Sequence, residues 1–194
     1  MRTAKKMTSF TLVRFFRRYP LWVAIAAKLS TVAVLLPACT ATTIPSSPQA
    51  QKVQPSTGSI EFVLSDAEGA PVSSESLRGR RSLLVFVTTY DLGAQLVARR
   101  VEEVLRTARP RVNALGVVME RGTYLPLLET YAEATGLSYP LVLADGATFD
   151  GRGPLGDVDY VPTIVVLDDR LRRVFKLQGA VTVREIEQAL SQVQ

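Results

Sequence analysis

The side chains that most often carry chemistry are scarce in this chain. Its 194 residues include one cysteine, Cys39, and no histidine. A single cysteine cannot form an intramolecular disulfide, a CxxC redox pair or a cysteine zinc site. Without histidine there is no Ser-His or Cys-His nucleophile and no imidazole metal ligand. We therefore expect no resident cofactor and no metal centre, and the carboxylates and tyrosines become the remaining candidates for a catalytic role.

One acidic, glycine-rich segment, residues 145–159, is the place where a metal ion would be considered. Its four aspartates, Asp145, Asp150, Asp157 and Asp159, do not follow the D-x-D-x-D-G spacing of a calcium loop with its later glutamate. The glycines of the chain also form no phosphate-binding loop. We interpret the segment as a solvated turn, with a calcium site as the alternative.

The elements that would position any functional residue begin after a distinctive N-terminal region. Residues 1–38 contain seven Lys or Arg and no Asp or Glu, and residues 21–36 are mostly apolar. The sequence Leu-Pro-Ala-Cys that ends at Cys39 resembles the bacterial lipobox, in which a signal peptidase cuts before a lipidated cysteine. We predict a lipoprotein-type signal peptide over 1–38 and lipidation of Cys39. An uncleaved anchor with an incidental cysteine and a functional thiol are the alternatives.

The charge of the chain changes at the same boundary. The net charge is +5, from 23 basic and 18 acidic residues. Because seven of the basic residues lie in 1–38, the rest of the chain carries 16 basic and 18 acidic residues, a net charge of −2. This balance excludes a nucleic-acid partner on the grounds of net charge. The basic and apolar N-terminal region and Cys39 instead predict a protein exported to the bacterial cell envelope, held on a membrane by its lipid and facing the periplasm.

Residues 39–59 are predicted to be a lipidated cysteine followed by a flexible tether. The segment from 40 to 59 is rich in Ser, Thr, Pro and Gln and has little apolar surface to bury. Residues 60–194 then form one domain, which is large enough to bury a core without a disulfide.

The pattern of apolar residues in 60–194 predicts an α/β fold that begins with a β-hairpin. The run 82–88 is continuously apolar, as in a strand buried on both faces. Apolar residues then recur at helical spacing from Ala94 to Leu105. Further strands are predicted at 60–64, 112–119, 141–143, 163–167 and 174–175, and further helices at 123–135 and 183–193.

Several short segments together resemble the TlpA-like and peroxiredoxin-like thioredoxin-fold proteins. Residues 62–72 resemble the strand-turn-strand that opens such a domain, and 77–80 resemble the corner that follows it. Residues 160–168 resemble the segment that carries the cis-proline of the family, which makes Pro162 the candidate. The resemblance covers residues 60–192 and implies a central mixed β-sheet flanked by helices.

The redox centre of that family is missing here. Where its members carry Trp-Cys-x-x-Cys at a helix N-terminus, this chain has Tyr90, Asp91, Gly93 and Ala94, with Asp91 and Ala94 in the places of the two cysteines. A carboxylate does not replace a thiolate in disulfide exchange or peroxide reduction. We interpret Asp91 as a helix N-cap, with a functional carboxylate as the alternative.

The favoured function is therefore a binding or scaffolding role for a redox-inactive thioredoxin-like domain, with an envelope protein or peptide as partner. The resemblance implies that Pro162 borders a groove in which an extended peptide pairs with the backbone. A non-thiol enzyme that uses Tyr90, Asp91 and Pro162 is the second interpretation. The third is a thiol-disulfide oxidoreductase or peroxiredoxin in name only, with its catalytic cysteines lost.

Overall fold

The computed structural model describes residues 49–52, 58–121 and 125–193. The chain divides into two units, 1–43 and 44–194, and every described residue belongs to the second. The predicted signal peptide and the lipidation of Cys39 lie outside the described residues. Among the residues that are described, no helix has the length and apolar character needed to cross a membrane.

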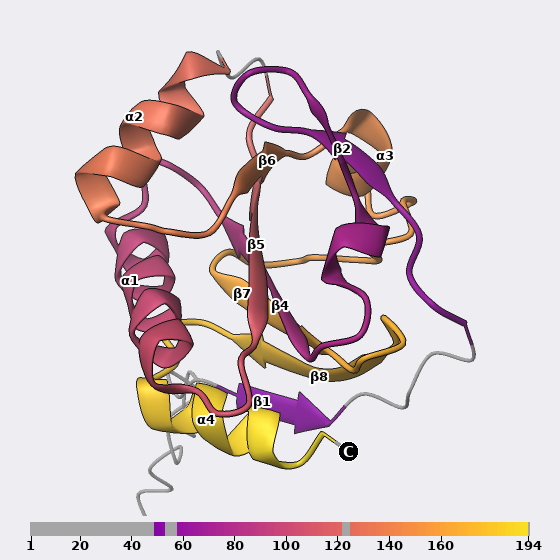
Figure 1. Ribbon diagram of the computed structural model, residues 1–194. Helices are drawn as coiled ribbons and strands as arrows, with labels where there is room; N and C mark the ends of the chain where they lie inside the picture. The colour runs from indigo at the N-terminus through magenta and orange to yellow at the C-terminus, as the bar shows by residue number, and fades with distance from the viewer. Residues whose placement is uncertain (1–48, 53–57, 122–124, 194) are drawn as a thin grey trace, which may run out of the picture. The chain divides into compact units, whose positions relative to one another are not determined.

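An eight-stranded sheet organises the domain, with strand order β1-β8-β7-β4-β5-β6-β2-β3 (Figure 1). Strands β4, β5 and β6 are parallel to one another, and the neighbouring pairs of β4 with β7 and of β7 with β8 are antiparallel. The sheet is therefore mixed, as predicted. The strands are β1 (Gln49–Lys52), β2 (Val63–Ser65), β3 (Pro71–Ser73), β4 (Ser82–Val87), β5 (Asn113–Val118), β6 (Leu141–Leu143), β7 (Thr163–Leu167) and β8 (Arg173–Gln178).

The helices follow the predicted order with two additions, the short α3 and a 3₁₀ helix. They are α1 (Leu92–Thr107), α2 (Pro126–Thr135), α3 (Gly146–Phe149) and α4 (Val183–Ser191), with a 3₁₀ helix η1 (Ser74–Leu77) after the opening hairpin. Helix α2 ends at Gly136, which has a φ of 71° and closes the helix in the left-handed conformation that glycine adopts without strain. The short helix α3 lies inside the acidic segment that the sequence suggested was a turn.

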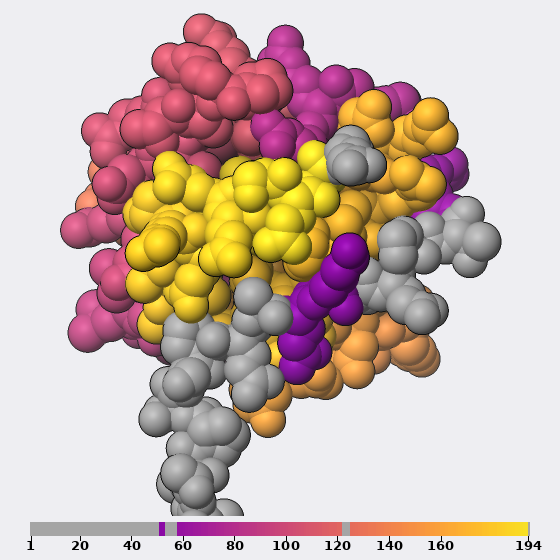
Figure 2. Space-filling view, turned by 90° about the horizontal axis from the view of Figure 1, so that it is seen from below, coloured from indigo at the N-terminus to yellow at the C-terminus, as the bar shows by residue number. Residues whose placement is uncertain are grey.

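The predicted tether is shorter in the structure than in the sequence interpretation. Residues 49–52, which were assigned to the tether, form β1 and pair antiparallel with β8 at the edge of the sheet. An edge strand needs only backbone hydrogen bonds on one side, so a polar sequence without an apolar period can form it. Figure 2 shows β1 beside α4 on the face viewed from below.

The core has two layers because alternate side chains of β4 point to opposite faces of the sheet. Leu83, Val85 and Val87 belong to the layer covered by α1, α2 and α4. Leu84 and Phe86 belong to the other layer, which is closed by residues from 60–64, η1 and the loop after α3. Both faces of β4 are buried, as its continuous apolar run predicts.

The turn between β7 and β8 depends on the buried carboxylate of Asp168. Its Oδ1 accepts hydrogen bonds from the backbone N–H groups of Arg170 (2.9 Å) and Arg172 (2.8 Å), and its Oδ2 pairs with Arg172 Nε at 2.7 Å. We expect Asp168→Ala to lower the free energy of unfolding by about 2 kcal/mol, because these donors lose a charged acceptor. Urea unfolding followed by circular dichroism measures the change. Asp169→Ala is the control, since Asp169 is exposed and is held only through its backbone oxygen.

Candidate functional site

The loop after β4 ends in a well-formed helix cap. Asp91 has extended backbone angles (φ −93°, ψ 119°), and its Oδ1 accepts a hydrogen bond from the N–H of Gly93 at 2.8 Å. The Asp91 carbonyl oxygen accepts the first helical hydrogen bond, from Gln95 N at 3.0 Å. The carboxylate also lies at the positive end of the α1 dipole. The structure thus places Asp91 where the sequence interpretation expected a cap.

The side chains around Asp91 divide between core and surface. Ala94 is fully buried against the sheet, and Gly93 is partly buried. Tyr90 and Leu92 point outward, each with a relative exposure of 78%. The loop therefore presents one aromatic and one aliphatic side chain to solvent at the N-terminus of α1.

Pro162 lies at the same edge of the sheet as this loop. Strands β4 and β7 are antiparallel neighbours with Phe86 opposite Thr163, so the end of β4 adjoins the start of β7. The Val161–Pro162 peptide bond is cis, and Pro162 is buried. Tyr160, two residues earlier, is 69% exposed. We call the exposed set Tyr90, Leu92 and Tyr160 the tyrosine surface.

The backbone of the loop is held on both sides at Thr89. Its N–H donates to a carboxylate oxygen of Glu120, which follows β5, and its carbonyl oxygen accepts from Gln95 Nε2 at 3.0 Å. Parallel strands β4 and β5 end at the same edge, which brings Glu120 to the loop. These contacts hold the backbone on the N-terminal side of Tyr90, and so help to position this residue of the tyrosine surface.

A buried tyrosine lies behind the loop. Tyr131 of α2 is 5% exposed, and its hydroxyl has no hydrogen-bond partner among the described residues. Burial, with smaller effects from the carboxylates of Glu120 and Asp91, raises the pKa of Tyr131 to about 12. The Thr88 hydroxyl is likewise buried and without a partner among those residues. Neither group was identified from the sequence, because nothing in a helical stripe or an apolar strand marks an unpaired hydroxyl.

Removal of the Tyr131 hydroxyl should not destabilise the domain. We expect Tyr131→Phe to leave the free energy of unfolding unchanged or to raise it by about 1 kcal/mol, because a buried hydroxyl without a partner is costly. Tyr139→Phe is the matched control, since the Tyr139 hydroxyl donates to the Ala98 carbonyl oxygen at 3.1 Å. This control should lose about 1 kcal/mol in the same urea titration. An equal loss in both variants would contradict the assignment.

The raised pKa of Tyr131 also has a consequence for stability at high pH. The folded state keeps the phenol neutral up to about pH 12, whereas the unfolded chain ionises near the usual pKa of 10.0. Because only the unfolded chain ionises between these values, the free energy of unfolding is unaffected below pH 10 and falls as the pH rises from about 10 to about 12. Tyr131→Phe should therefore lose less stability than the wild type across this window.

The acidic segment is occupied by structural contacts. Asp145 caps α3 by accepting from Thr148 N at 2.7 Å. Hydrogen bonds from Arg121 and then Arg152 lower the pKa of Asp150. Asp159 lies 3.7 Å from Lys176 Nζ. In the described ranges, no group of three or more acidic, cysteine or histidine side chains is placed to hold a metal ion.

Sequence comparisons identify no relative: no family model and no curated protein matches the chain. Solved structures do match its fold. A DsbF homologue from Corynebacterium diphtheriae aligns with a TM-score of 0.63 at 14% identity, over 77% of this chain and 96% of its own. A secreted Mycobacterium tuberculosis disulfide oxidoreductase homologous to Escherichia coli DsbE aligns with a TM-score of 0.58 at 18% identity, over 69% and 97% of the two chains.

A thiol:disulfide interchange protein from Chlorobium tepidum gives the same result, with a TM-score of 0.57 at 21% identity over 74% of this chain and 99% of its own. These matches span nearly the full length of the solved proteins. At this level of identity the likeness concerns the fold. The described residues of this chain therefore have a thioredoxin-like fold.

Proposed function

We propose that this chain is an exported, lipid-anchored protein of the bacterial envelope whose thioredoxin-like domain binds a partner and does not exchange disulfides. The observation that supports this best is Asp91. It is the N-cap of α1, the position at which the resembling oxidoreductases carry their first cysteine. Ala94, fully buried, stands at the second position.

Disulfide exchange needs a thiolate that attacks sulfur and a second thiol that resolves the mixed disulfide. The whole chain has one cysteine, which lies outside the domain at position 39. The Asp91 carboxylate can accept N–H hydrogen bonds at the helix N-terminus, and it does so here, but it cannot form a bond to sulfur that is later released. Under this proposal the domain keeps the helix N-terminus of the active site but has neither of the two cysteine sulfur atoms that react.

The tyrosine surface supports a binding role. Tyrosine is common at interaction sites because it offers a large apolar ring with a polar end and few rotatable bonds. Tyr90 and Tyr160 are among the few large hydrophobic side chains of the described residues that are exposed by more than two thirds. An extended segment of another envelope protein could lie across this surface beside Pro162 and pair with exposed backbone.

Attachment to the membrane follows from the N-terminal sequence. A lipid on Cys39 would stand ten residues before β1, which begins at Gln49. Ten extended residues reach about 35 Å at most, so the domain would stay close to the bilayer. Intact mass measurement of the membrane-extracted protein tests this part. A full-length chain with an unmodified residue 39 would rule out the lipoprotein assignment.

Site-specific photo-crosslinking in the native membrane tests the binding role. A photoreactive amino acid replaces Tyr90, and a matched control replaces Gln188, which is exposed on α4. We expect a discrete adduct from position 90 and none from position 188, because only position 90 lies on the tyrosine surface. Equal adducts from both positions, or none from either, would contradict a binding site at the loop.

A further inference from the structure

Basic residues gather at the edge of the sheet opposite the candidate site. Arg80 lies two residues before β4, and Arg109 and Arg111 precede β5. Arg106 lies in the last turn of α1, which descends to the same edge (Figure 1). Because β4 and β5 are parallel, their N-terminal ends share one edge.

The other edge of the same strands is acidic. Asp91 follows β4, Glu120 follows β5 and Asp145 lies just beyond β6. The chain beyond residue 38 has a net charge of −2, so a basic edge is not explained by an excess of positive charge. Arg121 also follows β5, but it is paired with Asp150. The N-terminal ends of the parallel strands thus carry arginines without a carboxylate partner, and their C-terminal ends carry mainly acidic groups.

The four arginines line a hollow of about 580 Å³, which we call the arginine groove. No acidic residue is among those that line it. Its wall also includes the polar side chains of Ser76, Asn113 and Ser138 and the apolar side chains of Leu77, Leu105, Val112, Ala114, Tyr139 and Pro140. The groove therefore offers cationic donors above a partly apolar floor.

None of the four arginines of the groove has a carboxylate partner among the described residues. Within the described residues, the side chains of Arg80, Arg106 and Arg111 make no hydrogen bond or ion pair, and only the backbone oxygens of Arg80 and Arg106 accept one. Arg109 donates only to carbonyl oxygens, to Ala108 at 2.8 Å and Arg106 at 3.3 Å. By contrast, Arg78 pairs with Glu75, Arg172 with Asp168, and both Arg121 and Arg152 with Asp150. Guanidinium groups crowded without counter-charges favour the binding of an anion.

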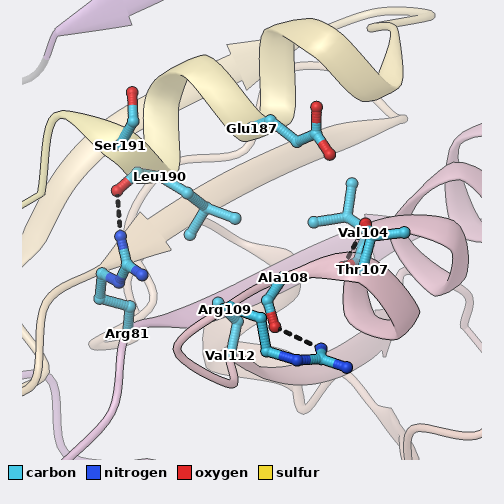
Figure 3. A pocket seen from close by; sticks show the side chains of 9 residues that line it. All are labelled: Arg81, Val104, Thr107, Ala108, Arg109, Val112, Glu187, Leu190 and Ser191. Carbon is cyan, nitrogen blue, oxygen red and sulfur yellow. Dashed lines mark hydrogen bonds between the residues drawn. The ribbon is translucent and has the colours of Figure 1, made fainter.

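A second hollow adjoins the arginine groove and is more apolar. It measures about 390 Å³, lies between the C-terminal end of α1 and α4, and shares Arg109 and Val112 with the groove. In Figure 3, Arg81 reaches from the start of β4 to the Leu190 carbonyl oxygen, with Val104 facing α4. Glu187 is the one acidic residue in its lining. A cationic groove beside a hollow whose lining is partly apolar (Val104, Ala108, Val112 and Leu190) matches an anion that carries hydrocarbon.

We propose that the arginine groove docks on anionic phospholipid headgroups of the membrane that holds the chain. The guanidinium groups of Arg80, Arg106, Arg109 and Arg111 hydrogen-bond to lipid phosphates, and the adjoining hollow faces the upper acyl region. This inference rests on the membrane attachment in the proposed function, which keeps the groove within reach of lipid. Docking by this edge turns the opposite edge, with the tyrosine surface, away from the bilayer.

Hydrogen exchange on the full-length chain, reconstituted into vesicles, tests the proposal. Vesicles of phosphatidylcholine alone are compared with vesicles that also contain phosphatidylglycerol. We expect exchange of the amides in 104–114 to slow only on the anionic vesicles, and the slowing to disappear in high salt, which screens the charges.

Two triple variants, each of which removes three positive charges, test whether docking needs the arginines of the groove in particular. Arg80→Gln/Arg106→Gln/Arg111→Gln should reduce the ratio of docked to undocked domain by about 100-fold, at about five-fold for each arginine near an anionic surface. Arg99→Gln/Arg170→Gln/Arg184→Gln removes three exposed arginines elsewhere and should keep the slowing. Equal loss in both variants would overturn the proposal, because it would report net charge alone.

The remaining outcomes distinguish docking on lipid from the binding of a free anion. They also distinguish failure of the docking from failure of the proposed membrane attachment. Equal slowing by inorganic phosphate with neutral vesicles would overturn membrane docking in favour of a free phosphate site. No slowing on anionic vesicles would also overturn it. Flotation with phosphatidylcholine vesicles reports attachment independently, so a chain that floats without slowing retains its anchor and lacks only the docking surface. A chain that floats with neither kind of vesicle would contradict both the membrane attachment and the docking surface.

Discussion

An Asp91→Cys/Ala94→Cys variant is expected to form an intramolecular disulfide and to gain disulfide reductase activity, which the proposed function does not assign to the wild type. In an ideal helix, Cα atoms three residues apart are about 5 Å apart, which is within the range that a disulfide spans. Asp91 is the N-cap and Ala94 lies in the first turn, so the two positions have this spacing. A thiolate at position 91 would also be stabilised by the helix N-terminus, which lowers its pKa below the usual value of about 8.5.

The variant is made with Cys39→Ser, so that the two introduced thiols are the only ones in the chain. The thiols are counted with maleimide in urea, because position 94 is buried in the folded domain; loss of both thiols after mild oxidation, and their return with reductant, measures the disulfide. Insulin reduction measures the activity. Loss of the Asp91 cap should cost about 1 kcal/mol of stability, which leaves the domain folded.

A spacing control shows whether position matters. Asp91→Cys/Ala98→Cys places the thiols about 10 Å apart along the helix, too far for a bridge. This control should keep both thiols reactive and should not reduce insulin. If the 91/94 pair also stays reduced, then Asp91 and Ala94 do not occupy the positions of a redox pair, and the resemblance on which the proposed function depends fails at its central point.

Much of the fold could be predicted because its central elements have strong apolar patterns. The continuous apolar run at 82–88 is β4, and the helical stripe from Ala94 to Leu105 lies in α1. Strand β1 and helix α3 were missed for a physical reason. A short polar edge strand is held by backbone hydrogen bonds to β8, and a four-residue helix is held by one Asp145 cap, and neither leaves a periodic signal.

The candidate site likewise has one part that the sequence predicts and other parts that only the fold brings together. Asp91 was identifiable because a capping residue directly precedes its helix. The contact between Thr89 and Glu120 joins residues 31 positions apart, and it exists only because β4 and β5 pair in parallel. Likewise, the arginine groove combines Arg80 with three arginines from the end of α1 and the start of β5. The sequence shows these charges as short clusters near acids, and only the structure shows that no such acid forms an ion pair with them: the Glu102 carboxylate, for example, accepts from Ser138 instead.

Strand β4 begins just after Arg80 of the arginine groove and ends just before the loop that carries Tyr90. A substitution in the core of this strand is therefore expected to have the second large effect, and we choose Phe86. This side chain is fully buried, lies in the layer of Leu84 and Leu115, and stands on a strand paired with β5 and β7. We expect Phe86→Ala to lower the free energy of unfolding by about 4 kcal/mol, from lost apolar burial and the cavity left behind. For a domain of this size that is a large share of a total of about 5–15 kcal/mol.

Urea unfolding of the full chain, followed by circular dichroism, measures this loss. Leu92→Ala is the control, because Leu92 is 78% exposed and its truncation should change stability by less than about 0.5 kcal/mol. The loop that carries Tyr90 continues directly from β4, so Phe86→Ala should also weaken the crosslink from position 90. A loss of stability no larger than that of the control would show that β4 is not the central support of the sheet, and the geometry of both functional edges would have to be reconsidered.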